Sequence, residues 1–434
     1  MLPDLEAFLA QQPLYSTHEH LRYEADALAA VGNKTEDILW LFTVHYTSSD
    51  LRSAGASVGD INFIQNIAEP FARQHERLVQ FAMRCRNTTQ MRVLHHGLRE
   101  LYGGDVYELS DAEEMQRQRE AAHGKGIYRE ILQRRGLIKL LCRDCGERFD
   151  EPEYFRTAIR MEEWIGVSSL NQLRVLEERS GTSIHSLSDL TAALRSEAQR
   201  LIGRGAIAFK NAMIYRRDPT WMNRSFAEAE RGFNALCRIV HAEWVDDGSA
   251  WSPKLRALQD YLYGELCALA AANGIPMQIH TGVPEGNLLP VAWGDPFRLL
   301  GLIRMFPSLQ IHLLHVAHPF EREAASLAKV HPNVYIDCSW IHQLNAHATR
   351  FYLNWLLDEV PYWKILGFGG DYAHVEGVFA HLLQARHNLS IALRERIDVG
   401  ACDVREAHRL LTAMLWDNPK RVLYNRETMP DTSA

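Results

Sequence analysis

Short apolar runs alternate with longer amphipathic stretches from residue 136 onward. Helical periodicity marks the stretches between most of these runs, for example residues 191–204 and 319–332. One further run, Leu14 to His20, lies near the start of the chain. Together the eight runs predict a parallel (β/α)₈ barrel, in which functional residues lie at the C-terminal ends of the strands. The seven later runs are GLIKLLCRD, FRTAIRMEEWI, GAIAFKNAMIY, PMQIHTG, LQIHLLHVAH, NVYIDCSW and KILGFGGDY.

Residues 24–135 follow a different pattern. They are polar-rich and helical in period, as in residues 61–85 and 108–135, and they lack strand-like runs. We therefore predict an α-helical insertion after the first strand. The predicted division is 1–23 for an N-terminal helix and the first barrel strand, 24–135 for the insertion and 136–434 for the rest of the barrel.

Composition narrows the class of protein. The 434 residues are 47% hydrophobic and 23% charged, which is ordinary for a globular protein and excludes disordered, collagenous and coiled-coil classes. With 47 Lys and Arg against 54 Asp and Glu, and no basic block, we expect neither nucleic acid nor a membrane surface as partner. The start lacks a signal peptide and no apolar run could span a bilayer, so we expect a cytoplasmic protein. Seven scattered cysteines indicate reduced thiols.

Histidines gather near the ends of the predicted strands. His18 and His20 are two residues apart, so they share one face of the first strand while Glu19 points to the other. In PMQIHTG, the same alternation places Gln278 and His280 on one face. An isolated HxH is usually a packing accident, and His280 alone is as consistent with a core histidine as with a functional one.

Two later strands supply further candidates. In IHLLHVAH, His315 is nearest the end of the apolar run and is the best candidate, whereas His312 is more consistent with a structural role and His318 with the following loop. Asp371 ends an apolar strand that runs into glycines, where an acid suits a metal ligand or general base. The alternative for Asp371 is an ordinary turn residue.

Lys210 lies inside an apolar strand, where an unpaired ammonium group is costly. Three explanations remain open: an ion pair, recognition of a substrate carboxylate, or carbamylation to a carboxylate that bridges two metal ions. Arg160, Tyr215 and Arg216 are candidates for binding a substrate carboxylate, although surface pairing explains them equally well. Trp340, with His342, could line the pocket.

Other motifs have simpler explanations. Ser57 fits a GxSxG nucleophile pattern, but its polar, helical surroundings lack the strand that such an elbow needs. Cys142 and Cys145 form a CxxC without a second pair, which favours packing thiols over a zinc site. His95 and His96 in the insertion are best explained by a solvated helix face.

The combination of motifs resembles the amidohydrolase superfamily. The similarity rests on THEH, AFKNAMIYRR, PMQIHTG, HLLHVAHPFEREAASLAKVHPNVYIDCSW and GFGGD, and is strongest at residues 276–340. The branch it resembles most is the amidohydrolase domain attached to some fungal glutamine-synthetase-like proteins of the fluffy type. One departure is Thr17, which stands where the family usually has an acid. The resemblance implies a metal-dependent barrel hydrolase with candidate ligands His18, His20, Lys210, His280, His315 and Asp371.

The resemblance also assigns roles around the metal. Arg160 and Glu162 match positions near the end of the third strand that contact substrate or support the ligands, and Gln278 and Trp340 join Tyr215 and Arg216 as candidate substrate contacts. We expect Asp371, His315 and Lys210 to be the catalytic residues.

Imidazoles with a carboxylate suit one or two divalent ions, Zn²⁺ first and Mn²⁺ second. Such an ion makes hydroxide available at neutral pH, and Asp371 would move the proton to the leaving group.

Three functions follow from these residues. The first is a metal-dependent hydrolase that cleaves an amide-type C–N bond of a small polar or carboxylate-bearing substrate. The second is a decarboxylase or uronate-type isomerase on the same barrel, favoured by one metal ion and an unmodified Lys210. The third, a binding protein without activity, is disfavoured because all ligand types are present. The sequence leaves homo-oligomer formation open.

Overall fold

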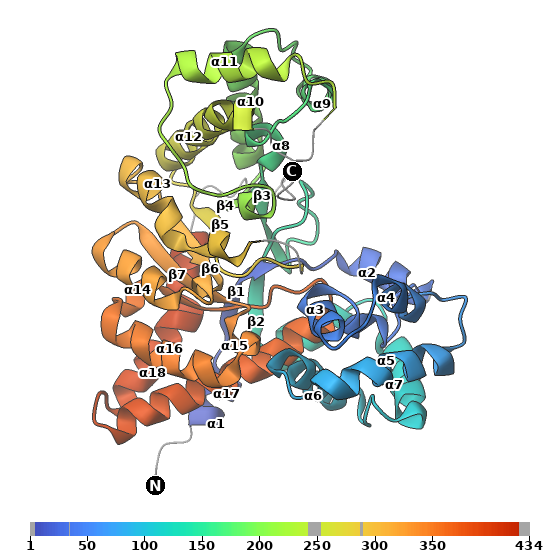
Figure 1. Cartoon of the computed structure of the whole chain (residues 1–434). Helices are drawn as coiled ribbons and strands as arrows, with labels where there is room; N and C mark the ends of the chain where they lie inside the picture. Colours follow the sequence, from blue (N-terminus) through green and yellow to red (C-terminus); the bar gives the residue numbers. More distant parts are fainter. Residues whose placement is uncertain (1–4, 34, 242–252, 287–289, 425–434) are drawn as a thin grey trace, which may run out of the picture.

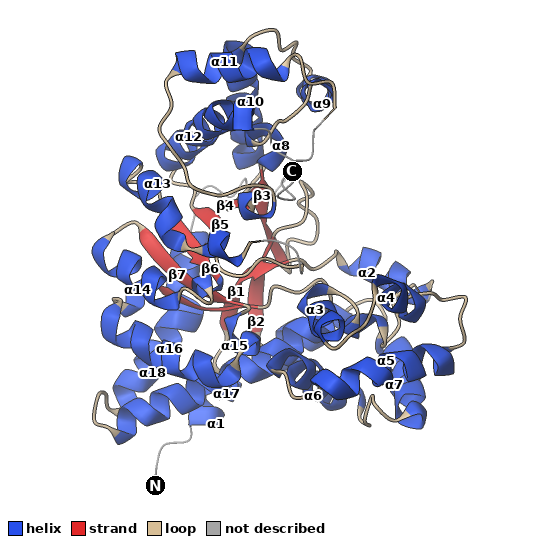
Figure 2. Ribbon diagram, in the orientation of Figure 1, coloured by secondary structure: helices blue, strands red, loops and turns tan. Residues whose placement is uncertain are grey.

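A computed structural model describes residues 5–33, 35–241, 253–286 and 290–424 of the chain. Eight parallel strands form one sheet in chain order, which confirms the predicted barrel (Figure 2). Backbone hydrogen bonds just past the strand ends close it, from Asp371 N to His18 O and from His20 N to Tyr372 O. The strands are β1 (Leu14–Glu19), β2 (Ile138–Arg143), β3 (Phe155–Arg160), β4 (Ala208–Asn211), β5 (Met277–His280), β6 (Ile311–Leu314), β7 (Val334–Ser339) and β8 (Ile365–Gly369).

Helices surround the sheet on its outer side (Figure 1). The N-terminal helix α1 (Leu5–Gln11) packs against the long α17 (Val375–Asp398). The other helices of the barrel are α8 (Glu162–Ile165), α9 (Leu170–Ser180), α10 (Leu187–Gly203), α11 (Phe226–Leu236), α12 (Arg256–Ala272), α13 (Leu300–Met305), α14 (Glu321–Val330), α15 (Ile341–Leu344), α16 (Ala346–Glu359) and α18 (Val404–Thr412).

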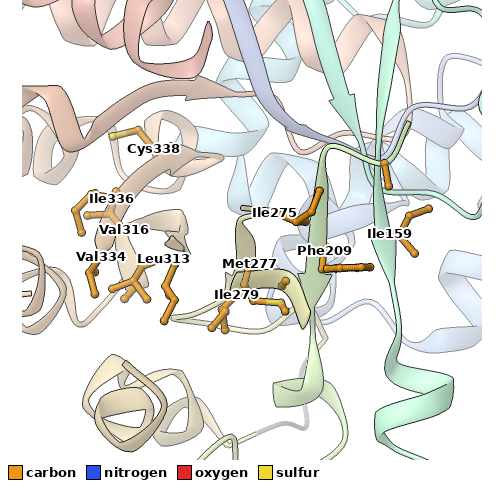
Figure 3. Close-up of a cluster of buried hydrophobic side chains, with 14 of the residues drawn as sticks. Ile159, Phe209, Ile275, Met277, Ile279, Leu313, Val316, Val334, Ile336 and Cys338 are labelled. Carbon is orange, nitrogen blue, oxygen red and sulfur yellow. The ribbon is translucent and has the colours of Figure 1, made fainter. Parts of the chain in front are cut away.

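The strands present apolar side chains to the helices, and toward their C-terminal ends they present polar ones to the barrel interior. Nearer the strand starts, Ala208 and Leu366 belong to a small buried apolar cluster. Figure 3 shows the outer set, with Phe209, Met277 and Leu313 in one buried cluster. Lys210 on β4 is paired in register with Gln278 on β5, and both residues lie on the opposite face of the sheet. The alternation expected for Met277 and Gln278 is therefore present. Because the interior is polar near the C-terminal ends of the strands, charged side chains can gather there at the mouth of the barrel.

The segment between β1 and β2 is helical. Its helices form a separate apolar cluster that includes Phe42, Leu78 and Leu94, beside the barrel (Figure 1). The helix α6 packs against α17 at Gly97, where an added Cβ would lie 2.2 Å from Cβ of Ala380. The helices are α2 (Glu24–Gly32), α3 (His45–Ser53), α4 (Val58–Ile64), α5 (Phe71–Cys85), α6 (Thr89–Tyr102) and α7 (Leu109–Ala122), followed by a π-helical turn, Arg129–Arg135.

The structure explains two of the competing motifs. Ser57 is the N-cap of α4 and forms a capping box with Asp60, so it serves a helix start rather than a nucleophile elbow. Cys142 is buried on β2, and the sulfur of Cys145 contacts the carbonyl of His20 at 3.3 Å. None of the helices that the structure describes combines the length and apolar content needed to cross a membrane.

Candidate metal centre

Three side chains converge where the barrel closes. His18 and His20 extend from the end of β1, and Asp371 follows β8. Oδ1 of Asp371 lies 3.3 Å from Nε2 of His18 and 3.1 Å from Nε2 of His20. One ligand atom from each residue falls within 4.8 Å of the others, so a single cation could contact all three. The strand periodicity that brings both histidines to one face thus produces the expected pair.

A second set of side chains fixes the orientation of this triad. The carbonyl oxygen of Asp144, just after β2, accepts a hydrogen bond of 3.1 Å from Nδ1 of His20. Nδ1 of His20 thereby carries a proton, so Nε2, which donates to Asp371 in the cation-free protein, is the atom that a cation would bind. The Asp144 carboxylate binds Arg160 through both oxygens and lies 3.9 Å from the Lys210 ammonium group. That ammonium group lies 3.0 Å from Nε2 of His18.

Burial and charge tune the protonation of these groups. Burial, followed by the charge of Lys210, lowers the pKa of His18 to about 3, so His18 is neutral and able to bind a cation. Burial also lowers the pKa of Lys210 to about 8. For His20, burial opposes the charged form, but the hydrogen bonds to Asp371 and Cys145 and the charges of Asp371 and Asp144 together outweigh it and raise the pKa to about 10. The carboxylates thus favour a positive charge at this position, either a proton or a metal ion.

The triad suits a divalent metal on its own geometry. Two Nε2 atoms and a carboxylate oxygen converge, and Nδ1 of His20 is already engaged by a carbonyl group, as is usual for metal-bound histidines. Nδ1 of His18 is buried and has no hydrogen-bond partner among the described residues. Such a donor set fits Zn²⁺ or Mn²⁺ and leaves coordination positions for substrate or water.

His280 and His315 form a separate pair beside the triad. Nδ1 of His315 lies 3.1 Å from the carbonyl oxygen of Ser339 and must donate to it. Burial lowers the pKa of His315 to about 4, so its Nε2 carries no proton and accepts from Nδ1 of His280 at 3.1 Å. Burial also keeps His280 neutral by lowering its pKa well below the usual value. The Nε2 atom of His280 therefore carries a lone pair, 3.4 Å from the hydroxyl of Tyr215.

The triad opens into a cavity of about 460 Å³. His20, Asp371 and His280 line it from the barrel, and His45 and Tyr46 line it from α3 of the insertion. A second cavity of about 620 Å³ adjoins it, since both are lined by Arg160 and Tyr215.

The backbone around the triad is unusual. Positive φ angles, uncommon outside glycine, occur at His45, His315, Trp340 and Asp371. Such conformations persist where surrounding structure holds them, and they cluster at functional sites.

Comparison with known proteins agrees with this geometry. Residues 227–424 match the profile of a family described as Amidohydrolase. This matched part, a little under half of the chain, is similar to the amidohydrolase superfamily. A curated relative, Protein fluG from Emericella nidulans, is 25% identical over 251 residues, which cover 56% of this chain. The match spans only 28% of that relative, so the similarity to the fungal branch is weak.

Solved structures share the fold of this chain. The glucuronate isomerase from Caulobacter crescentus has a TM-score of 0.76 and 21% identity, with 98% of this chain and 94% of that one covered. A Lactobacillus casei protein described as a metal-dependent hydrolase has a TM-score of 0.65 and 17% identity, with 97% and 98% covered. The covered portion includes the helical insertion, because nearly the whole chain is aligned.

The other predicted site residues lie at different depths. Tyr215 and Arg160 line both cavities, and Arg216 and Glu162 line the second. Glu162 is buried and accepts a hydrogen bond from Ala212 N. Three further predicted residues lie behind the cavities rather than on their walls: Gln278 is fully buried and donates to Thr17 O, Trp340 stacks on Tyr46, and His342 binds the carbonyl of Gly367.

Several residues around the site were not predicted from the sequence, among them Asp144, His45 and Tyr46. Asp144 ends the LLCRD run, so the end-of-strand argument that selected Asp371 could also have selected it. His45 and Tyr46 lie in a polar, helical segment with no local sign of chemistry, and only the packing of α3 over the barrel brings them to the cavity.

Proposed function

We propose that this protein is a single-metal isomerase of a small sugar acid, a hydroxylated substrate with a carboxylate. The observation that carries this proposal is a three-residue centre beside a Lys210 amine that already has a charge partner in Asp144. A lysine in this state is an ion-pair residue and supplies no bridging carboxylate for a second ion. The full-length similarity in fold to a glucuronate isomerase suggests the substrate class.

The chemistry of such a reaction matches the groups in the cavity. Conversion of an aldose to a ketose moves a proton from C2 to C1 and another between the two oxygens, with no net gain of water or electrons. The metal ion would polarise these oxygens and lower the cost of removing the carbon-bound proton. His280, neutral and with its Nε2 lone pair toward the cavity, accepts a proton, and the hydroxyl of Tyr215 exchanges one with a substrate oxygen.

The substrate carboxylate has a preorganised partner in Arg160. Its Nε and one Nη atom bind Asp144 at 2.7–2.9 Å, which fixes the guanidinium plane. The side chain remains 43% exposed at the boundary of the two cavities, so the rest of the guanidinium group can donate to an anion.

A metal-dependent hydrolase of an amide-type C–N bond is the second candidate. It is favoured by the His280–His315 pair, whose nitrogens could hold a second ion if Lys210 were carbamylated. Asp371 would then act as the general acid and base in hydrolysis, with His315 and Lys210 as further catalytic groups.

Metal content and product analysis separate the two candidates. We expect about one metal ion per chain, with or without added bicarbonate. We also expect interconversion of glucuronate or a related sugar acid, with uptake of deuterium at carbon in D₂O, and loss of metal and activity in Asp371→Asn. Two ions per chain that depend on bicarbonate, together with hydrolysis of N-acyl or γ-glutamyl amides, would establish the hydrolase instead.

A further inference from the structure

Glu19 stands between the two histidine ligands, but its side chain extends to the opposite side of β1. Its carboxylate is fully buried. Oε1 accepts hydrogen bonds from the Ser16 hydroxyl at 2.6 Å and from Gly370 N at 2.8 Å. Oε2 accepts one from Tyr372 N at 3.3 Å. The two backbone donors are the residues immediately before and after Asp371, so one carboxylate holds both sides of a candidate metal ligand.

The backbone of Asp371 needs such support. Its φ of +57° lies in the left-handed region, which residues other than glycine adopt only when the surrounding structure holds them there. Asp371 N also donates to His18 O at 3.0 Å, and Nδ1 of His381 donates to Gly370 O at 3.1 Å. The peptide groups on either side of Asp371 are thus fixed from β1 and from α17, with Glu19 as the group that contacts both flanks.

Gly370 is shaped to this carboxylate. A Cβ atom added at Gly370 would lie 2.4 Å from Oε1 and 2.6 Å from Oε2 of Glu19, closer than any real contact. The close approach lets Gly370 N reach the carboxylate, and any larger residue would displace Glu19. The position of the Glu19 carboxylate therefore depends on glycine at position 370.

We propose that Glu19 is a positioning residue that holds Asp371 in its metal-binding conformation by accepting hydrogen bonds from the backbone on both sides of it. The proposal rests on the His18, His20 and Asp371 triad as the metal centre, but not on which reaction the enzyme performs. A failed isomerase assay would therefore leave it standing, whereas a metal-binding experiment tests it directly.

Two matched variants test the proposal. Glu24, at the start of α2, is also a buried carboxylate that accepts two backbone hydrogen bonds, from Gly126 N and Tyr128 N, but it lies in the insertion. Glu19→Ala and Glu24→Ala should both lower the melting temperature of the metal-free protein. Only Glu19→Ala should also weaken metal binding, by about 10- to 100-fold, as measured by competition with a chelator using Zn²⁺ alone. Wild-type affinity in folded Glu19→Ala would overturn the proposal.

Glu19→Gln gives a graded result, because one amide oxygen can replace only one of the two acceptors. Its affinity for Zn²⁺ should lie between those of wild type and Glu19→Ala. Its Co²⁺-substituted form should show an altered visible spectrum if the position of Asp371 changes.

If the Glu19 variants do not fold, amide hydrogen exchange in the metal-free wild-type protein tests the proposal instead. Protected amides at Gly370 and Tyr372 would support the proposal, and exchange as fast as in exposed loops would refute it.

Discussion

Asp144 is surrounded by positive charge inside the barrel. It contacts Arg160 at 2.7 Å and Lys210 at 3.9 Å, and all three charges lie at the edge of the metal centre. Burial opposes ionisation, but the charges of Arg160 and Lys210 outweigh it and lower the pKa of Asp144 to about 2. A group of this kind is costly to disrupt, because the remaining partner is left buried without compensation.

Removal of the Asp144 charge should therefore destabilise the protein strongly. We expect Asp144→Asn to lower the free energy of unfolding by about 3–5 kcal/mol, because Lys210 loses its buried partner. The control is Asp150→Asn, which removes an exposed ion pair with Arg148 and should change stability by less than about 1 kcal/mol. Urea unfolding at neutral pH measures both, and equal effects would contradict the expected role of Asp144.

At the scale of elements, a buried ion pair joins the insertion to the barrel. Nε of Arg119 on α7 donates to Glu376 on α17 at 2.6 Å, and both side chains are almost fully buried. The hydroxyl of Tyr102 on α6 donates to the same carboxylate. Glu376 lies in the first turn of the helix that follows the Asp371 loop, so this contact links the insertion to the segment that carries the candidate ligand Asp371.

The Arg119–Glu376 pair should make stability depend on acid pH. Burial alone would raise the pKa of Glu376, but the charge of Arg119 holds it well below its usual value of 4.5. The pair thus stabilises the fold above about pH 4.5, and that stability is lost as the pH falls toward the lowered pKa. We expect Arg119→Met to be less stable at neutral pH by about 3–5 kcal/mol and to lose less on acidification to pH 4. Denaturant unfolding at both pH values checks this, and parallel losses in the two proteins would disagree with it.

Replacement of Ser57, at the start of α4, should lower stability without changing activity. Because its side chain caps α4, Ser57→Ala should cost about 1 kcal/mol of stability. Its turnover should equal that of wild type, because Ser57 is an N-cap rather than a nucleophile. A thermal melt and a rate measurement are sufficient, and loss of turnover in a folded protein would restore the nucleophile hypothesis.

The strand and helix pattern was largely predictable from the chain. Period-two runs such as 276–280 and 334–339 mark strands because one face meets helices and the other meets the interior. End-of-strand position also identified His18, His20 and Asp371. Short apolar runs carry little information on their limits, however, and the apparent strand GAIAFKNAMIY contains only four strand residues, Ala208–Asn211.

At the scale of the whole molecule, the insertion forms part of the wall of the cavity beside the candidate triad. Tyr46 packs on Trp340 with a ring separation of 3.6 Å, and its hydroxyl lies 3.4 Å from that of Tyr215. A segment far from the later strands in sequence thus helps to shape the substrate cavity.

Truncation of Tyr46 should affect substrate binding without affecting the metal. We expect Tyr46→Ala to raise KM about tenfold, as loss of roughly 1.4 kcal/mol of binding would produce. Metal content should stay at the wild-type level, since Tyr46 is not among the triad. Tyr46→Phe keeps the stacked ring, so its KM should lie between those of wild type and Tyr46→Ala. Steady-state kinetics with metal analysis measure this, and loss of metal in Tyr46→Ala would place the residue in the centre itself.

The sequence by itself predicted the barrel and a helical segment after its first strand, and it marked His18, His20 and Asp371 as candidate ligands, which the structure brings close together. These features depend on periodicity and on position within a strand, which are local properties of the chain. Only the tertiary structure decided three contacts: the ion pair of Lys210 with Asp144, the hydrogen bond between His280 and His315, and the hydrogen bonds from the Asp371 loop to Glu19. Each joins residues far apart in the chain, and closure of the barrel determines which polar groups meet once water is excluded.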